Sequence, residues 1–180
     1  MIHKILLKAL VELDDWLLKK NLQLRLDVIG GIALHLHEID IQRATMDIDL
    51  ANEITNTDVL HQIREIGRSH GLDETWIEFP NVPVPFGSTY ESHRMFDGFS
   101  QIEVRLLALE FLILTKIAAY YDRKHIQATD AADIEAIVNA GGIFTTEVLE
   151  QGIGFIRSTR RVDERRISEV RDDLALLCQS

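Results

Sequence analysis

The pair of aspartates at positions 47 and 49 is the feature of this sequence most suited to chemistry. In an extended segment side chains alternate between faces, so Met46, Ile48 and Leu50 can be buried while Asp47 and Asp49 project together from the opposite face. Two neighbouring carboxylates repel each other unless a cation neutralises them. Mg²⁺ held by one or two carboxylates and substrate phosphates is usual in phosphoryl and nucleotidyl transfer, so the pair predicts a divalent-metal site.

Gly30 and Gly31 follow an apolar run, and two interpretations of them are open. The glycines could serve only a tight turn or close packing. Alternatively, their missing side chains let phosphate groups approach backbone N–H groups at the start of a helix. The Asp-x-Asp segment likewise has a second interpretation, a solvated strand edge.

Lys116 lies in the longest apolar tract, residues 106–121, which also contains Glu110. The tract is too short for a clean membrane span and predicts a buried core helix. A buried ammonium group needs an anionic partner, unless the stem packs and the charged head reaches water. Lys116 is therefore a candidate for binding an anion.

Composition limits the classes of protein to consider. A chain of 180 residues with 46% hydrophobic and 27% charged residues is typical of a globular protein with one core, or one core with a small appendage. We expect a core over residues 1–140 and a helical appendage over 141–180. The single cysteine, Cys178, excludes an internal disulfide and favours a reducing cytosol. The N-terminal apolar residues are broken by charges, which fits an amphipathic helix better than a signal peptide.

The net charge of −10 argues against a broadly basic surface for nucleic acid. Six arginines nevertheless fall within residues 157–171. On one continuous helix most of them would share an arc, as a docking strip for RNA or an acidic partner. The other interpretation is a solvated face interspersed with acids.

Hydrophobic periodicity predicts an α/β (α+β) fold with a small mixed sheet flanked by helices. Helices are expected near residues 3–20, 30–36, 57–70, 109–123 and 130–139 and from 145 onward, and strands near 24–29, 45–50, 75–79 and 101–106. The segment 80–100 contains all three prolines and predicts irregular structure or a hairpin.

The order of these features resembles a known family. The chain is similar to the minimal nucleotidyltransferase core of the polymerase-β superfamily. The shared order of features is a strand, Gly-Gly, a helix, an Arg-x-Thr-x-Asp-x-Asp strand, a later acidic strand and a lysine-bearing helix. Within it, the chain resembles the nucleotidyltransferase-like toxins of the AbiEii abortive-infection type. The matching segments are 30–34, 43–50, 102–104 and 116–123, followed by Asp130 and Asp133.

The resemblance implies a Mg²⁺-dependent enzyme, with one or two metal ions, that transfers a nucleoside monophosphate from a nucleoside triphosphate. The implied catalytic and metal-binding residues are Asp47, Asp49 and Glu103, with Asp97 as the alternative third carboxylate. The implied nucleotide-binding residues are Gly30, Gly31, Arg43, Thr45, Lys116 and Arg123.

The acceptor implied by the resemblance is RNA, such as a tRNA 3′ end, or a protein hydroxyl, and a cognate antitoxin is an expected partner. Asp130 and Asp133 are expected to pair with Lys116 or Arg123 rather than with substrate. The contrary hypothesis is a non-catalytic adaptor, because proteins of one fold can lose catalysis and become binding modules.

Overall fold

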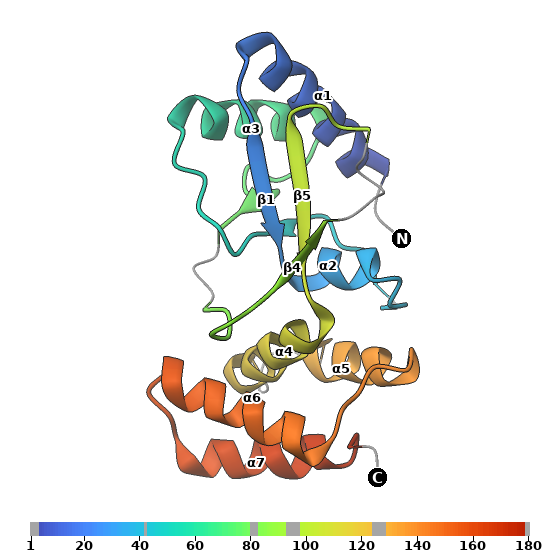
Figure 1. The fold of residues 1–180 in the computed structure, drawn as a ribbon, viewed down its shortest axis with the longest axis vertical. Helices are drawn as coiled ribbons and strands as arrows, with labels where there is room; N and C mark the ends of the chain where they lie inside the picture. Colours follow the sequence, from blue (N-terminus) through green and yellow to red (C-terminus); the bar gives the residue numbers. More distant parts are fainter. Residues whose placement is uncertain (1–3, 42, 80–82, 93–97, 124–128, 179–180) are drawn as a thin grey trace. The chain divides into compact units, whose positions relative to one another are not determined.

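The structure is a computed structural model that describes residues 4–41, 43–79, 83–92, 98–123 and 129–178. The chain forms two compact units, which are described separately (Figure 1). The first unit comprises Met1–Glu38, Gln42–Val82 and Thr89–Leu107, and the second comprises Ile39–Ile41, Pro83–Ser88 and Ala108–Ser180.

The first unit contains the strands and three helices. In chain order these are α1 (Lys4–Lys20), β1 (Leu24–Val28), α2 (Gly30–Leu36), β2 (Ile48–Asp49), α3 (Thr57–His70), β3 (Ile77–Glu78), β4 (Tyr90–Ser92) and β5 (Ile102–Leu107). Local sequence sets the helix ends. The Asn56 side chain caps α3 by accepting from Asp58 N and Val59 N, and α3 ends at Gly71 with φ of 69°.

The sheet is small and mixed, as the sequence predicts. β1 pairs with β5 in parallel, and β4 adds to the other edge of β5 in antiparallel orientation. β2 and β3 form a separate parallel pair, which an antiparallel bridge between Val28 and Leu50 joins to the end of β1. Figure 1 shows β1 and β5 side by side. Alternate residues of these strands are buried, so one face of the sheet packs into the core.

Asp14 fixes the start of β5 to α1. Its side chain is 7% exposed, and its two oxygens accept hydrogen bonds from the backbone N–H groups of Ser100, Gln101 and Ile102 at 2.7 to 2.9 Å. Burial alone raises the pKa of Asp14, but these N–H donors outweigh it and hold the pKa below its ordinary value.

Asp14→Ala should destabilise the protein by about 2 to 3 kcal/mol, because buried N–H donors lose a charged acceptor. Since the folded pKa is depressed, this stabilisation is present above the unfolded pKa of about 3.9 and is lost as pH falls through the folded value. Urea unfolding between pH 7 and pH 2 measures both effects, with Asp15→Ala, at an exposed neighbour, as the control. Equal losses at both positions would contradict the anchoring role.

The second unit is helical: α4 (Leu109–Arg123), α5 (Thr129–Asn139), α6 (Thr146–Thr159) and α7 (Glu164–Ala175). α4 packs against each of the other three helices. α4 is apolar around most of its circumference, so other helices must pack on several of its sides to bury it. This explains why α4 and α5 group with the C-terminal helices, although the sequence predicted a boundary near residue 140.

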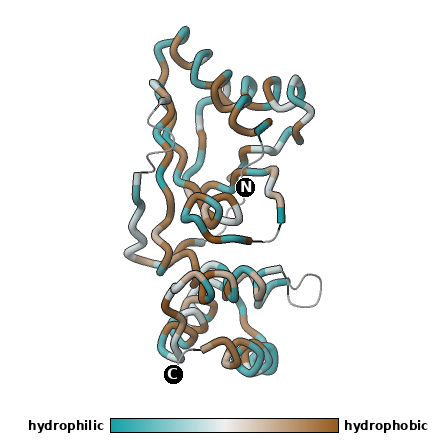
Figure 2. The backbone as a smooth tube through the Cα atoms, turned by 90° about the vertical axis from the view of Figure 1, so that its right-hand side faces the viewer, coloured by the Kyte–Doolittle hydropathy of each residue, from teal (hydrophilic) through white to brown (hydrophobic). Residues whose placement is uncertain are grey.

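Close packing of α4 on α6 depends on Gly152, because a Cβ there would lie 2.5 Å from Ile117 Cδ1. Figure 2 shows apolar and polar residues interspersed along the helices, as expected where one side of each helix is buried. None of the described helices has both the length and the apolar character needed to cross a bilayer.

Candidate functional site

The two glycines after β1 form the floor of the candidate site. Gly30 has φ of +71°, a left-handed conformation that favours glycine. A Cβ on Gly30 would collide with the carboxylate oxygen Oδ2 of Asp49. A Cβ on Gly31 would lie 3.0 Å from Thr45 Oγ1 and 3.2 Å from Arg43 Nη2. The structure therefore gathers five of the predicted site residues around one turn.

Backbone pairing positions Asp49. Ile29 N donates to Asp49 O at 2.9 Å, and Ala51 N donates to Asp27 O at 2.8 Å. These bonds flank the bridge between Val28 and Leu50, so Asp49 lies directly opposite Ile29, next to the glycine turn. The position of the aspartate follows from strand pairing and not from its side chain.

The side chains of this segment alternate as predicted, with one exception. Ile48 and Leu50 are buried, whereas Asp47 is exposed and Asp49 is partly exposed. Met46, expected to be buried, is 40% exposed, because regular strand structure begins only at Ile48. The outward position of both aspartates is confirmed.

Thr45 is the most informative side chain beside the glycines. It is only 5% exposed, and its Oγ1 has no hydrogen-bond partner within the described part of the chain. An unsatisfied buried hydroxyl costs about 1 to 3 kcal/mol and needs an explanation. A ligand oxygen above Gly31 would satisfy it. The exposed Arg43 is held nearby, because His35 Nε2 donates to its carbonyl oxygen at 3.1 Å.

Glu103, the predicted third carboxylate, is not brought to this turn. It lies on β5 opposite Arg25, whereas Asp49 lies opposite Ile29 at the other end of β1. Four residues of strand separate the two levels by roughly 13 Å. Glu103 and Asp49 thus cannot bind one ion at the short distances that Mg²⁺ requires. The alternative, Asp97, lies outside the described residues.

Glu78, which is not among the site residues predicted from the sequence, is the carboxylate that the strand register places beside Asp49. β2 and β3 are parallel, with Ile48 beside Ile77 and Asp49 beside Glu78. Partners in register share a face, so the partly exposed Glu78 points to the same side as Asp49 across a strand spacing of about 4.8 Å. The available signal was the buried–outward alternation of Ile77 and Glu78 in a predicted strand.

The carboxylates beside the glycine turn could hold a hard cation if substrate phosphates supplied its remaining ligands. Within the described ranges no three His, Cys, Asp or Glu side chains are close enough together to hold a metal ion. One or two carboxylates completed by phosphate oxygens is, however, a common Mg²⁺ arrangement. Asp47 and Asp49, which are exposed and partly exposed, are the two carboxylates that could take part in it.

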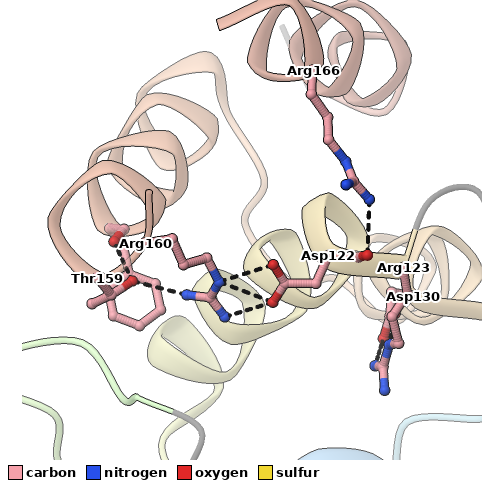
Figure 3. A network of polar contacts seen from close by, with 7 residues as sticks. Asp122, Arg123, Asp130, Thr159, Arg160 and Arg166 are labelled. Atoms are coloured by element: carbon pink, nitrogen blue, oxygen red, sulfur yellow. Dashed lines mark hydrogen bonds and ion pairs between the residues drawn. The ribbon is translucent and has the colours of Figure 1, made fainter. Parts of the chain in front are cut away.

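Lys116 belongs to the second unit, where it has the anionic partner that its burial requires. It is 4% exposed, and its Nζ lies 2.6 Å from Asp133 Oδ2 and 3.5 Å from Asp130 Oδ1. Arg123, about half exposed, donates through Nε and Nη2 to the two oxygens of Asp130 at 3.0 and 2.8 Å. The expected pairing of both acids with Lys116 and Arg123 is therefore observed (Figure 3 shows Arg123 with Asp130).

The C-terminal arginines do not lie on one continuous helix, because α6 ends at Thr159 and Asp163 caps a new helix. Several of them pair with acids: Arg157 with Glu164, Arg160 with Asp122, Arg165 with Glu169 and Arg171 with Glu150. Figure 3 shows the contacts of Arg160 and Arg166 with Asp122. This pairing favours the solvated face over a docking strip for nucleic acid.

Comparison with known families identifies a matching family model. A family model described as "Nucleotidyltransferase of unknown function (DUF6036)" matches residues 5–143. The matched range includes the glycine turn, both aspartates, Glu78, Glu103 and the lysine helix. Neither a curated protein nor a solved structure matches the chain.

Proposed function

Because this chain belongs to the nucleotidyltransferase family DUF6036, whose function is unknown, we propose that it transfers a nucleoside monophosphate from a nucleoside triphosphate to a hydroxyl acceptor. The acceptor is RNA, such as a tRNA 3′ end, or a protein. The resemblance to AbiEii-type proteins extends this proposal to a toxin controlled by a cognate antitoxin.

One observation carries the proposal: a tight glycine turn adjoins outward carboxylates and a buried hydroxyl that has no hydrogen-bond partner among the described residues. Asp49 Oδ2 lies against Gly30, and Thr45 Oγ1 lies against Gly31. Carboxylates alone would repel a triphosphate, so such a site needs a cation between them and the phosphates. Asp47 and Asp49 would hold Mg²⁺ together with phosphate oxygens.

The residues of the chain have separate tasks in the proposed reaction. Bound Mg²⁺ would supply neutralisation of the negative charge that develops on the phosphates. Gly30 and Gly31 leave room for a phosphate next to the backbone, and the Thr45 hydroxyl donates to a phosphate oxygen. The guanidinium of Arg43 counters triphosphate charge. Lys116 and Arg123, which the resemblance implies as nucleotide ligands, already pair with Asp133 and Asp130.

Transfer requires one bond to form and one to break. The acceptor hydroxyl oxygen attacks the α-phosphorus, its proton passes to a carboxylate, and pyrophosphate leaves with the electron pair of the broken P–O bond. Glu78 is the proposed proton acceptor, since it lies beside Asp49 and a carboxylate within hydrogen-bond reach can act as a general base.

The purified full-length chain should be incubated with each of the four α-labelled nucleoside triphosphates, Mg²⁺ and either an RNA pool or the protein alone. We expect label on one acceptor class with one preferred nucleotide, and loss of labelling when Mg²⁺ is chelated. Mg²⁺-dependent triphosphate binding without labelling would instead indicate a nucleotide-binding regulator. Neither binding nor labelling would overturn the proposal in favour of an adaptor.

A further inference from the structure

Arg105 belongs to a cluster that the proposed reaction does not use. Its Nε donates to Asp27 Oδ1 at 2.7 Å, and Asp27 is only 5% exposed. Arg25 Nη2 lies 3.4 Å from the other oxygen, Asp27 Oδ2. One buried carboxylate therefore holds two arginines on the sheet, and the hydrogen bond to Asp27 raises the pKa of Arg105.

Tyr90 fixes the plane of the Arg105 guanidinium. The carbon Cζ of Arg105 lies 5.3 Å from the centroid of the Tyr90 ring, on the neighbouring strand β4. Stacking on an aromatic ring and a hydrogen bond at Nε leave an arginine few rotamers. Such an arginine loses little conformational entropy when it binds a ligand, which is a property of preorganised sites.

The contacts of Arg105 leave part of its donor set available. Pairs of arginine with a carboxylate frequently use two parallel N–H groups of the guanidinium. Here Nε alone bonds Asp27, and within the described part of the chain neither Nη group has a hydrogen-bond partner. The side chain is 27% exposed, so ligands can reach it.

The register places Arg105 on the same face of the sheet as the candidate carboxylates. Arg105 lies beside Asp27, Asp27 lies opposite Ala51, and Asp49 is two residues from Ala51. Residues in register, and residues two apart on one strand, share a face. From the strand spacings, the Cα atoms of Arg105 and Asp49 are roughly 12 Å apart.

We propose that Arg105, positioned by Asp27 and Tyr90, binds a phosphate group of a substrate that lies across this face from Asp49. The inference rests on the proposed nucleotidyl transfer. A groove of about 680 Å³ is lined by residues that include Arg25, Gln101 and Ser92, the register partner of Arg105. It offers space for a ligand that extends beyond a triphosphate.

Arg105→Lys separates ligand binding from structure, because lysine keeps the charge that pairs with Asp27 but loses the planar donor fork. Calorimetric titrations with two probes, tripolyphosphate with Mg²⁺ and a single-stranded RNA oligonucleotide without a triphosphate, identify the source of the phosphate. We expect about a tenfold to hundredfold loss of affinity for one of them. Loss for tripolyphosphate indicates the donor nucleotide, and loss for the oligonucleotide indicates the acceptor.

Arg68→Lys is the matched control, because Arg68 is an exposed arginine of the same unit that pairs with Glu65 and Glu74. If Arg105→Lys lowers the melting temperature, the titrations use instead the double variant Asp27→Asn with Arg105→Gln, in which both side chains are uncharged. This double variant should show the same loss of affinity for the probe. Unchanged affinity for both probes, or no binding of either probe by the unmodified protein, would overturn the inference. If the unmodified protein labels an acceptor in the transfer assay but Arg105→Lys binds both probes with unaltered affinity, the inference about Arg105 is overturned and the proposed function still stands.

Discussion

Asp47→Asn combined with Asp49→Asn should abolish Mg²⁺-dependent triphosphate binding and leave the fold intact. Asparagine keeps the shape of each side chain but removes the negative charges that a hard cation requires. The backbone bond from Ile29 N to Asp49 O does not depend on the carboxylate and persists. We expect at least a hundredfold loss of affinity for a nucleoside triphosphate in the presence of Mg²⁺, measured by calorimetry, and transfer at background level.

The control for this double variant is Glu53→Gln with Asp58→Asn, which makes the same change of charge at exposed positions of the same unit. Denaturant unfolding should place both double variants within about 1 kcal/mol of the unmodified protein, as is usual for surface substitutions. Metal-dependent binding that survives in the Asp47 and Asp49 variant would refute the assignment of these carboxylates to the site.

Single substitutions then distinguish the two candidates for the third carboxylate. Glu78 is the register partner of Asp49, whereas Glu103 lies opposite Arg25. Glu78→Gln should therefore reduce transfer strongly while triphosphate binding persists, as expected for a general base. Glu103→Gln should leave transfer nearly unchanged. The reverse result would restore the prediction made from the sequence.

The difference between these two glutamates shows what the sequence could and could not predict. Alternation in a short strand is a local property, so the outward aspartates at 47 and 49 were predictable from their immediate neighbours. Which carboxylate lies beside Asp49 depends on which strands pair and in what register. That information lies in the packing of α3 and of the strands on either side of it, because 28 residues of chain separate Asp49 from Glu78. The family resemblance implies Glu103, whereas the choice of Glu78 requires both the alternation of Ile77 and Glu78 and the register of β2 with β3.

The C-terminal arginines show the opposite case, in which a local signal was present in the sequence. Asp163 accepts from Arg165 N and begins α7, and aspartate is a preferred helix cap. The shared arc of arginines is expected only on one continuous helix, and the cap at Asp163 indicates a new helix within this segment. The fold class can be predicted without the strand register or the helix cap, because strand and helix periodicities alternate clearly along the first 140 residues.

Lys116→Met should destabilise the protein by about 3 to 5 kcal/mol, the usual cost of removing one partner from a buried ion pair. Asp133 and Asp130 are 2% and 1% exposed, so the variant takes away the positive charge that Lys116 places beside these two buried carboxylates. The methionine fills most of the volume of the lysine stem, so the loss arises from charge and not from a cavity. Urea unfolding of the full-length chain measures it.

Two further variants establish the cause. Lys116→Met with Asp133→Asn removes both charges of the pair and should recover a large part of the lost stability, because no buried negative charge is then left at position 133. Arg165→Met removes a positive charge from a side chain that is 88% exposed and should cost little. If Lys116→Met instead unfolds like the unmodified protein but binds triphosphate tenfold to hundredfold more weakly, the ammonium group is a nucleotide ligand, as the family resemblance implies, and its pairing with Asp133 contributes little to the fold.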